Sequence, residues 1–252
     1  MKSYIQLYSL RTIIENNMDH VFKSLKSFGF DGVELAGFYG LSASKLKNIL
    51  DSYQLEVVST HESMTRLTEH IGQVIEDYKI LGTKNIVIPY TEMKDKASYE
   101  KMLPQIRKAV DSLTKAGYKV FYHNHANEFQ AFDNLYVIEH LLKDIPEIRL
   151  EFDIYWATFA KVDAISFLEK YKDRIDLIHA KDMIITDNGP HFESVGKGVI
   201  NYSEVYSIMK SGWIVENDKP LNDPLANVED SIKFIKELVG GKNESRSFNG
   251  SF

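Results

Sequence analysis

Cysteine is absent from this chain of 252 residues. Disulfides, thiolate nucleophiles and cysteine-ligated zinc or iron–sulfur sites are therefore excluded. Any metal ligands must be nitrogen and oxygen atoms, which suits Mn²⁺, Mg²⁺, Co²⁺, Fe²⁺ or Zn²⁺ better than thiophilic ions. A chain without cysteine is also typical of a cytosolic protein, and we expect a cytoplasmic location.

Long apolar runs and basic clusters are absent as well. No segment approaches the roughly 20 apolar residues that span a bilayer, and the first ten residues lack the apolar core of a signal peptide. The formal net charge is −6, whereas a nucleic-acid binder usually carries a basic face. We therefore expect a soluble protein that binds neither membranes nor nucleic acid. The pattern leaves open whether it forms a homo-oligomer.

Short apolar runs alternate with longer amphipathic stretches along the whole chain, which indicates repeated βα units. The strand-like runs are Tyr4–Ser9, Gly32–Ala36, Glu56–His61, Asn85–Tyr90, Lys119–Asn124, Arg149–Asp153, Asp176–Ala180 and Trp213–Glu216. The helix-like stretches are Met18–Phe28, Ser42–Tyr53, Leu67–Leu81, Ser98–Ala116, Asn134–Leu142, Ala164–Tyr171, Ser203–Met209 and Val228–Val239. Gly29, Gly82 and Gly117 stand where helix C-caps are expected.

This alternation predicts an α/β fold of the (β/α)₈ TIM-barrel type, whose usual length is about 250 residues. We assign residues 1–240 to one barrel domain, because no Pro-, Gly- or Ser-rich linker divides them. Residues 241–252, rich in Ser, Asn and Gly, are expected to be a flexible tail. A doubly wound open sheet is the competing arrangement, but no phosphate-binding glycine-rich turn follows the first strand.

Polar side chains gather at the predicted strand ends, where a barrel places its chemistry. Asp153, His179 and Glu216 end three successive strands. If such groups meet on the barrel axis, their partial desolvation requires a compensating cation, and a divalent metal is the simplest one. Further candidates at strand ends and in the loops beyond them are Glu34, His61, His123, His125, Glu128, Trp156 and Lys181.

Several conspicuous residues have simpler interpretations. His20, His70 and His140 lie in helical stretches and are expected on the surface or in packing contacts. The stretch Gly196–Gly198 is similar to a phosphate loop, but no complete Walker pattern surrounds it. We interpret it as a flexible loop that can contact a substrate.

The same residues carry a resemblance to the xylose-isomerase-like TIM barrels, the sugar phosphate isomerase/epimerase superfamily. The matching stretches are Gln6–Arg11, Gly32–Leu35, Tyr122–His125 with Glu128 and Phe129, Phe152–Trp156, His179–Asp182, Val195–Gly198 and Val215–Asp218. They occur in order over nearly the whole chain. Together they are specific for the superfamily, though not for a substrate.

The resemblance implies a metal held at the ends of strands five to eight by Glu, Asp, His and Glu. Asp153, His179 and Glu216 match the last three positions. The strand-five position is held by His123, so either His123 is the ligand, which we favour, or Glu128 reaches back from the loop.

The resemblance also implies roles in catalysis and binding. Glu216 is one candidate base, and the opposite base would be His125 or Glu128. Lys181 would neutralise an oxyanion or a phosphate. The remaining candidates, Glu34, His61 and Trp156, are assigned to substrate binding, with the tryptophan stacking on a sugar ring or serving only in packing.

The expected function is a metal-dependent isomerase or epimerase that acts on a small sugar, keto-sugar or sugar phosphate through an enediolate. A keto-sugar or inosose dehydratase, or lyase, using the same site is the first alternative. An AP-endonuclease-like nuclease is less favoured, because it needs further metal ligands and a basic groove. A non-catalytic sugar-binding barrel is the remaining alternative.

Overall fold

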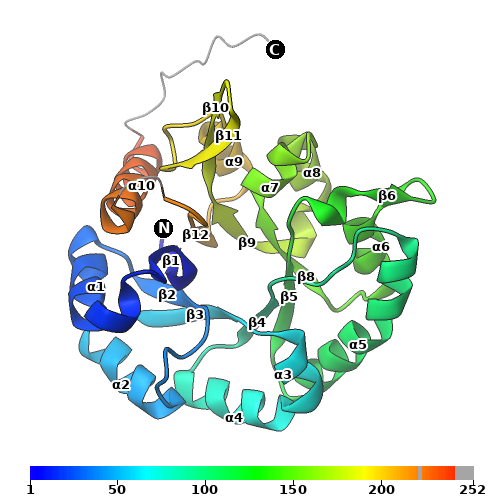
Figure 1. The fold of residues 1–252 in the computed structure, drawn as a ribbon, viewed down its shortest axis with the longest axis horizontal. Coiled ribbons are helices and arrows are strands. Elements are labelled where there is room, and N and C mark those ends of the chain that lie inside the picture. The colour runs from blue at the N-terminus through cyan, green and yellow to red at the C-terminus, as the bar shows by residue number, and fades with distance from the viewer. Residues whose placement is uncertain (221–222, 242–252) are drawn as a thin grey trace.

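The computed structural model describes residues 1–220 and 223–241, and its centre is a closed barrel of parallel strands (Figure 1). The barrel strands are β1 (Ser3–Gln6), β2 (Gly32–Leu35), β3 (Glu56–His61), β4 (Asn85–Ile88), β5 (Lys119–His123), β8 (Arg149–Asp153), β9 (Ile175–Ala180) and β12 (Trp213–Val215). Strand β12 pairs with β1, where Tyr4 lies opposite Ile214, and this pairing closes the ring. The predicted barrel is confirmed, and the open sheet is wrong.

Helices surround the barrel on its outside (Figure 1). They are α1 (Ile14–Phe28), α2 (Ala43–Ser52), α3 (Met64–Glu69), α4 (Ile71–Leu81), α5 (Lys96–Lys115), α6 (Val137–Asp144), α7 (Ile154–Phe159), α8 (Ala164–Tyr171), α9 (Tyr202–Ile208) and α10 (Pro224–Val239). Short 3₁₀ helices are η1 (Leu7–Leu10), η2 (Asn127–Phe129) and η3 (Lys172–Arg174). Within the described residues, none of the helices is long and apolar enough to cross a lipid bilayer.

Local sequence signals account for many helix boundaries. The Ser42 hydroxyl accepts a hydrogen bond from the Lys45 amide and caps α2, which buries Leu46 and Leu50. Gly29 ends α1 with a left-handed φ of 88°, a conformation that glycine adopts without steric cost. These signals agree with the helix boundaries expected from the sequence.

Several predicted boundaries are wrong, and three of them illustrate the local causes. Strand β1 ends at Gln6 rather than Ser9, because the Gln6 side chain accepts a hydrogen bond from the Tyr8 amide and turns the chain into η1. The single helix expected over Leu67–Leu81 is broken at His70, whose φ of −131° is not helical. Helix α10 begins at Pro224, four residues before the expected start.

Two hairpins were not predicted from the sequence. One pairs β6 (Ala131–Phe132) with β7 (Leu135–Tyr136), in a region where only a helix was expected. The other pairs β10 (Asp182–Thr186) with β11 (Gly189–Glu193) and follows β9 on the mouth side of the barrel. Residues 242–252, most of the predicted flexible tail, lie outside the described residues.

The barrel interior is built in layers that position the functional side chains. Its apolar layer is a separate buried cluster of Tyr4, Val87, Phe121, Leu177 and Ile214. Side chains alternate along a strand, so residues two positions further on point to the same interior. Four of these five residues are followed at that spacing by a polar side chain: Gln6, His123, His179 and Glu216. A polar layer therefore lies directly above the apolar layer, at the C-terminal end of the barrel.

Candidate metal and substrate site

The upper layer brings together the four proposed metal ligands. His123, Asp153 and His179 stand at or near the ends of β5, β8 and β9, and Glu216 directly follows β12. All four are buried. Their ligand atoms lie within 4.8 Å of one another, which is close enough for one cation to reach all of them.

Glu151 is the central residue that the sequence analysis missed. It is fully buried on β8, two positions before Asp153 and on the same face of the strand. Its Oε2 lies 2.7 Å from His61 Nε2, 3.0 Å from His179 Nε2 and 3.2 Å from His123 Nδ1. Strand alternation alone could have identified it, because a charged residue two positions from an inward-facing aspartate must also face the interior.

The two imidazoles among the proposed ligands present different ring nitrogens to Glu151. His179 directs Nε2 to Glu151 and Nδ1 to Glu216, whose Oε2 is 2.7 Å away. His123 directs Nδ1 to Glu151 and Nε2 toward Asp153 Oδ2 at 3.7 Å. Metal-binding histidines commonly donate their second N–H to a carboxylate, which fixes the ring and its tautomer. Here one carboxylate, that of Glu151, faces a ring nitrogen of both imidazoles.

A second group of donors lies beside the first. His61, His123, Glu151 and His179 also have ligand atoms within 4.8 Å of one another. In this group every imidazole faces Glu151 Oε2, and His61 Nε2 forms a hydrogen bond with that oxygen at 2.7 Å.

Lys181 is buried against the carboxylates of the proposed metal site. Its Nζ lies 2.8 Å from Asp153 Oδ2, 2.7 Å from Glu216 Oε2 and 2.9 Å from Asp218 Oδ2. Burial alone would lower the pKa of Lys181, but these three carboxylates raise it well above its ordinary value. The ammonium group therefore stays charged and uses oxygens that a metal would also need.

The electrostatics of the two clusters show a surplus of negative charge. Five carboxylates, Glu34, Glu151, Asp153, Glu216 and Asp218, face one lysine and three histidines. Burial raises the pKa of Asp153 to about 6. Burial would lower the pKa of His179, but Glu151, Glu216 and Glu34 raise it well above its ordinary value. Even with His61 and His179 protonated, the carboxylates outnumber the cations, which is the setting that a divalent cation relieves.

The donor set fits a divalent metal in other respects as well. It consists of imidazole nitrogen and carboxylate oxygen, the ligands that Mn²⁺, Fe²⁺, Co²⁺ and Zn²⁺ accept. His123 Nδ1 and Glu151 Oε1 are buried and make no hydrogen bond with good geometry. The interior thus retains unused donor and acceptor capacity at the place where the four ligands meet.

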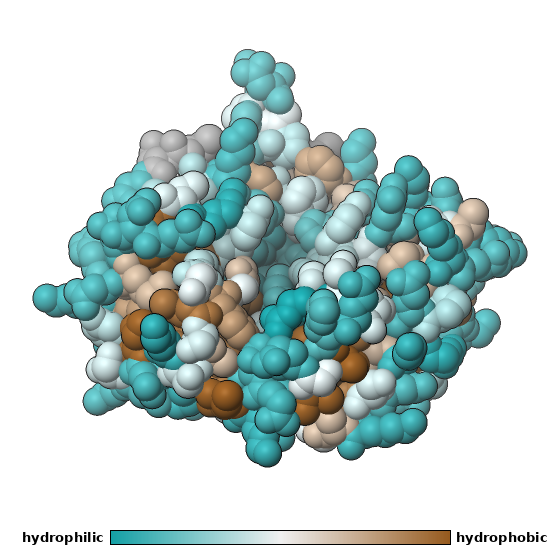
Figure 2. Space-filling view, turned by 60° about the horizontal axis from the view of Figure 1, so that its bottom comes forward, coloured by the Kyte–Doolittle hydropathy of each residue, from teal (hydrophilic) through white to brown (hydrophobic). Residues whose placement is uncertain are grey.

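A cavity of about 770 Å³ opens directly over this layer. Figure 2 shows the molecule hollowed near its centre, with mainly hydrophilic residues around the hollow. The lining residues are Tyr8, Ala36, Gly37, His61, Glu62, Ser63, Arg66, Pro89, Tyr90, His123, His125, Trp156, Phe192, Glu216, Asp218 and Lys219. The cavity therefore joins the proposed ligands His123 and Glu216 to the predicted contact residues His61, His125 and Trp156.

Among the residues predicted for catalysis or substrate binding, Glu34, Glu128 and Lys181 do not line this cavity. The Glu34 carboxylate accepts hydrogen bonds from Gln6 Nε2 and Ser59 Oγ, both at 2.7 Å, and lies 2.7 Å from His179 Nε2. Burial and the neighbouring Glu151 raise the pKa of Glu34 to about 7. These contacts place it beneath the ligands rather than on the substrate wall.

Glu128 also lies off the cavity wall. Its two oxygens accept hydrogen bonds from the Tyr122 hydroxyl and the His125 amide, at 2.7 and 2.8 Å. Burial raises the pKa of this carboxyl to about 7. Glu128 therefore holds the loop after β5 in place and positions His125, whose imidazole does reach the cavity.

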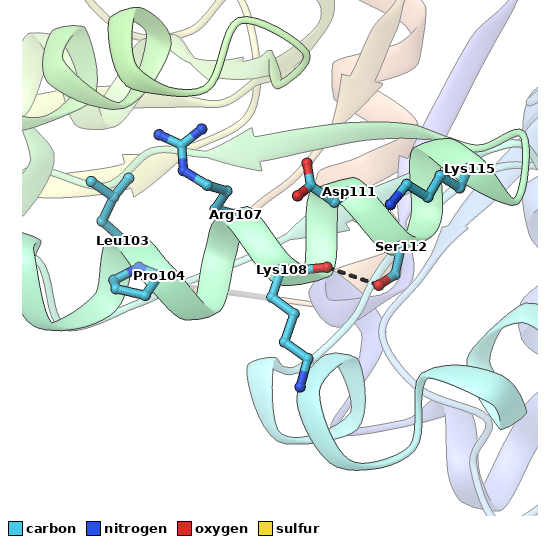
Figure 3. Close-up of a pocket in the computed structure, with 7 residues that line it drawn as sticks. All are labelled: Leu103, Pro104, Arg107, Lys108, Asp111, Ser112 and Lys115. Atoms are coloured by element: carbon cyan, nitrogen blue, oxygen red, sulfur yellow. Dashed lines mark hydrogen bonds between the residues drawn. The ribbon is translucent and has the colours of Figure 1, made fainter.

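Another depression, of about 430 Å³, lies on the outer surface of α5 (Figure 3). All of its labelled residues come from this one helix, and the hydrogen bond drawn there joins the Ser112 hydroxyl to the Lys108 carbonyl. It is a helix surface far from the strand ends and gathers no metal-ligating side chains, so the chemistry belongs to the barrel mouth.

Residues 22–238 match the model of the family described as xylose isomerase-like TIM barrel. The chain belongs to this family. Among xylose isomerase-like relatives, an inosose dehydratase of Bacillus cereus is 24% identical over 273 aligned positions, covering 90% of this chain and 91% of that protein.

Solved structures of other proteins share the fold. A sugar phosphate isomerase/epimerase from Parabacteroides distasonis is 24% identical, with a TM-score of 0.77 and 93% of each chain covered. The IolI protein, solved with a bound zinc atom, is 15% identical, with a TM-score of 0.71 and coverage of 97% of this chain and 100% of the other. The homologues are enzymes, so this xylose isomerase-like protein is expected to be one too.

Proposed function

We propose that this protein is a divalent-metal-dependent isomerase or epimerase that removes the proton next to the carbonyl group of a small keto-sugar. The observation that carries the proposal is the arrangement of His123 and His179 between Glu151 on one side and Asp153 with Glu216 on the other. Imidazoles held in this way by one carboxylate are prepared for metal binding. The zinc atom of the IolI structure agrees with a metal in this family.

His123, Asp153, His179 and Glu216 would hold the metal at the base of the cavity. A divalent ion bound there would act as a Lewis acid on the substrate carbonyl and stabilise negative charge that develops on its oxygen. Beneath these ligands, we assign Glu151 and Glu34 to orienting them. Glu34 thus moves from the predicted substrate contacts to the support of His179.

Glu216 is the proposed proton acceptor, because it is the one carboxylate among the four proposed ligands that also lines the cavity. Burial would raise its pKa, but Lys181 and His179 hold the pKa of Glu216 well below its ordinary value, so it is ionised. The substrate proton passes to Glu216, the C–H electron pair forms a C=C bond, and the carbonyl π electrons move onto the oxygen, which gives an enediolate. Return of the proton to the adjacent carbon, with transfer of the hydroxyl proton to the first oxygen, completes isomerisation, whereas epimerisation needs a second base to deliver a proton to the other face.

His125 is the proposed second polar group above the substrate. It lines the cavity, and its Nδ1 has no hydrogen-bond partner among the described residues. Burial and the nearby Lys181 lower the pKa of His125 to about 3, so the imidazole is neutral at physiological pH. A neutral imidazole can accept a hydrogen bond or a proton from a substrate hydroxyl.

A dehydratase is the second candidate, and one observation favours it. An epimerase needs a second base on the opposite face of the substrate; Glu128 is not on the cavity wall, and His125 is assigned here to a substrate hydroxyl. Glu62 is on the wall, but its oxygens already accept from the Ser63 amide, the Arg66 guanidinium and the Tyr78 hydroxyl. Loss of a β-hydroxyl after proton removal needs one such base, and the similar Bacillus proteins are inosose dehydratases.

Proton exchange tests both candidates. Metal-loaded protein is incubated in D₂O with a set of ketoses and inososes, and the products are followed by NMR and by the ultraviolet absorbance of an enone. Deuterium at the α-carbon without an enone supports the isomerase or epimerase, and an enone supports the dehydratase. The variant His125→Asn should keep the metal content and lose most of the rate. If no keto-sugar exchanges with a metal-loaded sample, the proposal is wrong.

A further inference from the structure

Resting on the proposed function, we infer that the substrate is an uncharged keto-sugar that still carries a second ring or another bulky neutral group, and that the site rejects sugar phosphates. Three independent features carry this inference. They are an internal carboxylate that already binds the amides of the loop after β11, a cavity whose arginine is already paired and whose wall carries carboxylates, and an aromatic mouth larger than one sugar ring.

TIM barrels often bind phosphate with backbone amides of the loops after strands seven and eight. The corresponding loop here, Val195–Asn201, directs its amides to the Asp182 side chain. Gly196 N and Gly198 N donate to Asp182 Oδ2 at 2.9 and 3.1 Å, and Ile200 N donates to Oδ1 at 3.2 Å. A carboxylate of the protein itself therefore already engages these three amides, which are not free to bind a phosphate.

Packing around the same carboxylate explains the glycine at position 198. A Cβ on Gly198 would lie 2.2 Å from Asp182 Oδ1 and 2.3 Å from the Met183 carbonyl oxygen. The loop approaches Asp182 so closely that a side chain does not fit. None of the residues Gly196–Gly198 is among those that line the cavity, so substrate contact by this stretch stays a prediction, and its likeness to a phosphate loop reflects an internal anion.

Arg66, one of the two Lys or Arg residues that line the cavity, already has ion-pair partners. Arg66 binds Glu62 Oε2 at 2.8 Å and Asp77 Oδ2 at 2.7 Å. Lys181 lies beneath the cavity and is surrounded by three carboxylates. Within residues 1–220 and 223–241, Lys219 is the single cavity-lining cation without an ion-pair partner.

Carboxylates also line the wall, Glu62, Glu216 and Asp218 among them. A phosphate dianion entering here would lose hydration and meet like charges at close range. This combination opposes its binding.

The mouth of the cavity suits a larger neutral ligand. Its volume of about 770 Å³ lies in the upper part of the roughly 300–1,000 Å³ range of pockets that enclose drug-sized molecules. Aromatic rings from four separate segments line it: Tyr8, Tyr90, Trp156 and Phe192. Tyr8 and Tyr90 are 43% and 49% exposed. Exposed rings at a site entrance provide faces for a second sugar ring or an apolar group, beyond what the reacting sugar covers.

A matched set of ketoses tests the inference directly. Fructose, fructose 6-phosphate and isomaltulose share the same ketose, and differ in carrying hydrogen, phosphate or a neutral glucosyl group on O6. Each is titrated calorimetrically into the metal-loaded protein, and α-proton exchange in D₂O is followed in parallel. We expect isomaltulose to bind about tenfold more tightly than fructose, and fructose 6-phosphate to bind more weakly than either. In Tyr90→Ala, the preference for isomaltulose over fructose should shrink.

The outcomes separate this inference from the proposed function. Tighter binding of isomaltulose without proton exchange supports the substrate class and contradicts the enediolate chemistry. Binding of fructose 6-phosphate at least as tight as that of isomaltulose overturns the substrate class, even if exchange proceeds. Equal binding of all three ketoses, or no binding of any, overturns it too.

Discussion

Replacing Glu151 with glutamine should sharply reduce metal affinity, although Glu151 is not itself among the proposed ligands. Glutamine has nearly the same size and keeps one oxygen acceptor, but it lacks the negative charge that the carboxylate presents to the ring nitrogens of His123 and His179. Loss of such a supporting carboxylate typically weakens metal binding about 10- to 100-fold. Because Glu151 serves two ligands, we expect about 100-fold, or about 2.7 kcal/mol.

The assay is competition for Mn²⁺ or Zn²⁺ against a chelating indicator, with circular dichroism to verify folding. Glu139→Gln is the matched control, because Glu139 is also a buried glutamate with three hydrogen-bond partners, but lies on α6 outside the barrel. The control should bind metal like the wild type. Wild-type affinity in Glu151→Gln would refute the reasoning, because the two imidazoles would then be oriented without this carboxylate.

Three further substitutions test the roles of Lys181, Glu128 and Gly198. Lys181→Met should destabilise the metal-free protein by about 3–5 kcal/mol, because it leaves three carboxylates without their ammonium partner. Added Mn²⁺ should restore part of that loss, and unchanged metal-free stability in denaturant titrations would contradict this role. Glu128→Gln should remove one contribution to the pH dependence of the free energy of unfolding. Because burial raises the Glu128 pKa from 4.5 to about 7, the folded state retains a proton that the unfolded state releases between these values. Wild-type stability should therefore fall with rising pH in this window, by up to about 3 kcal/mol, and the variant should lack this decline. Gly198→Ala should lower the free energy of unfolding by about 2–3 kcal/mol through collision with Asp182, whereas Gly72→Ala, with nothing within 4 Å of the added Cβ, should cause no loss.

The barrel could be predicted from sequence because its signals are local and repeated. Apolar strands such as β4 and amphipathic helices such as α2 recur at a spacing typical of βα units. Elements that depend on irregular turns were missed. The β10–β11 hairpin contains Gly189 and Pro190 and little apolar alternation, so nothing in its composition marked it as paired strands.

The site was predicted in part for the same reason. Asp153 and His179 end recognisable strands, so their convergence follows from barrel topology. Glu151 lies inside a strand and was overlooked, although alternation places it on the inner face. The assignments of Glu34 and Glu128 could not be judged without side-chain contacts, because a strand-end carboxylate can point to substrate or to a buried hydroxyl with equal sequence support.

Metal content is the most direct test of the central claim. The wild-type protein, Asp153→Ala and His179→Ala are loaded with Mn²⁺, passed over a desalting column and measured by elemental analysis, with Glu139→Gln as the folded control. We predict a stoichiometric divalent metal in the wild type and the control, and little or none in the two site variants. Stoichiometric metal in both Asp153→Ala and His179→Ala would contradict it.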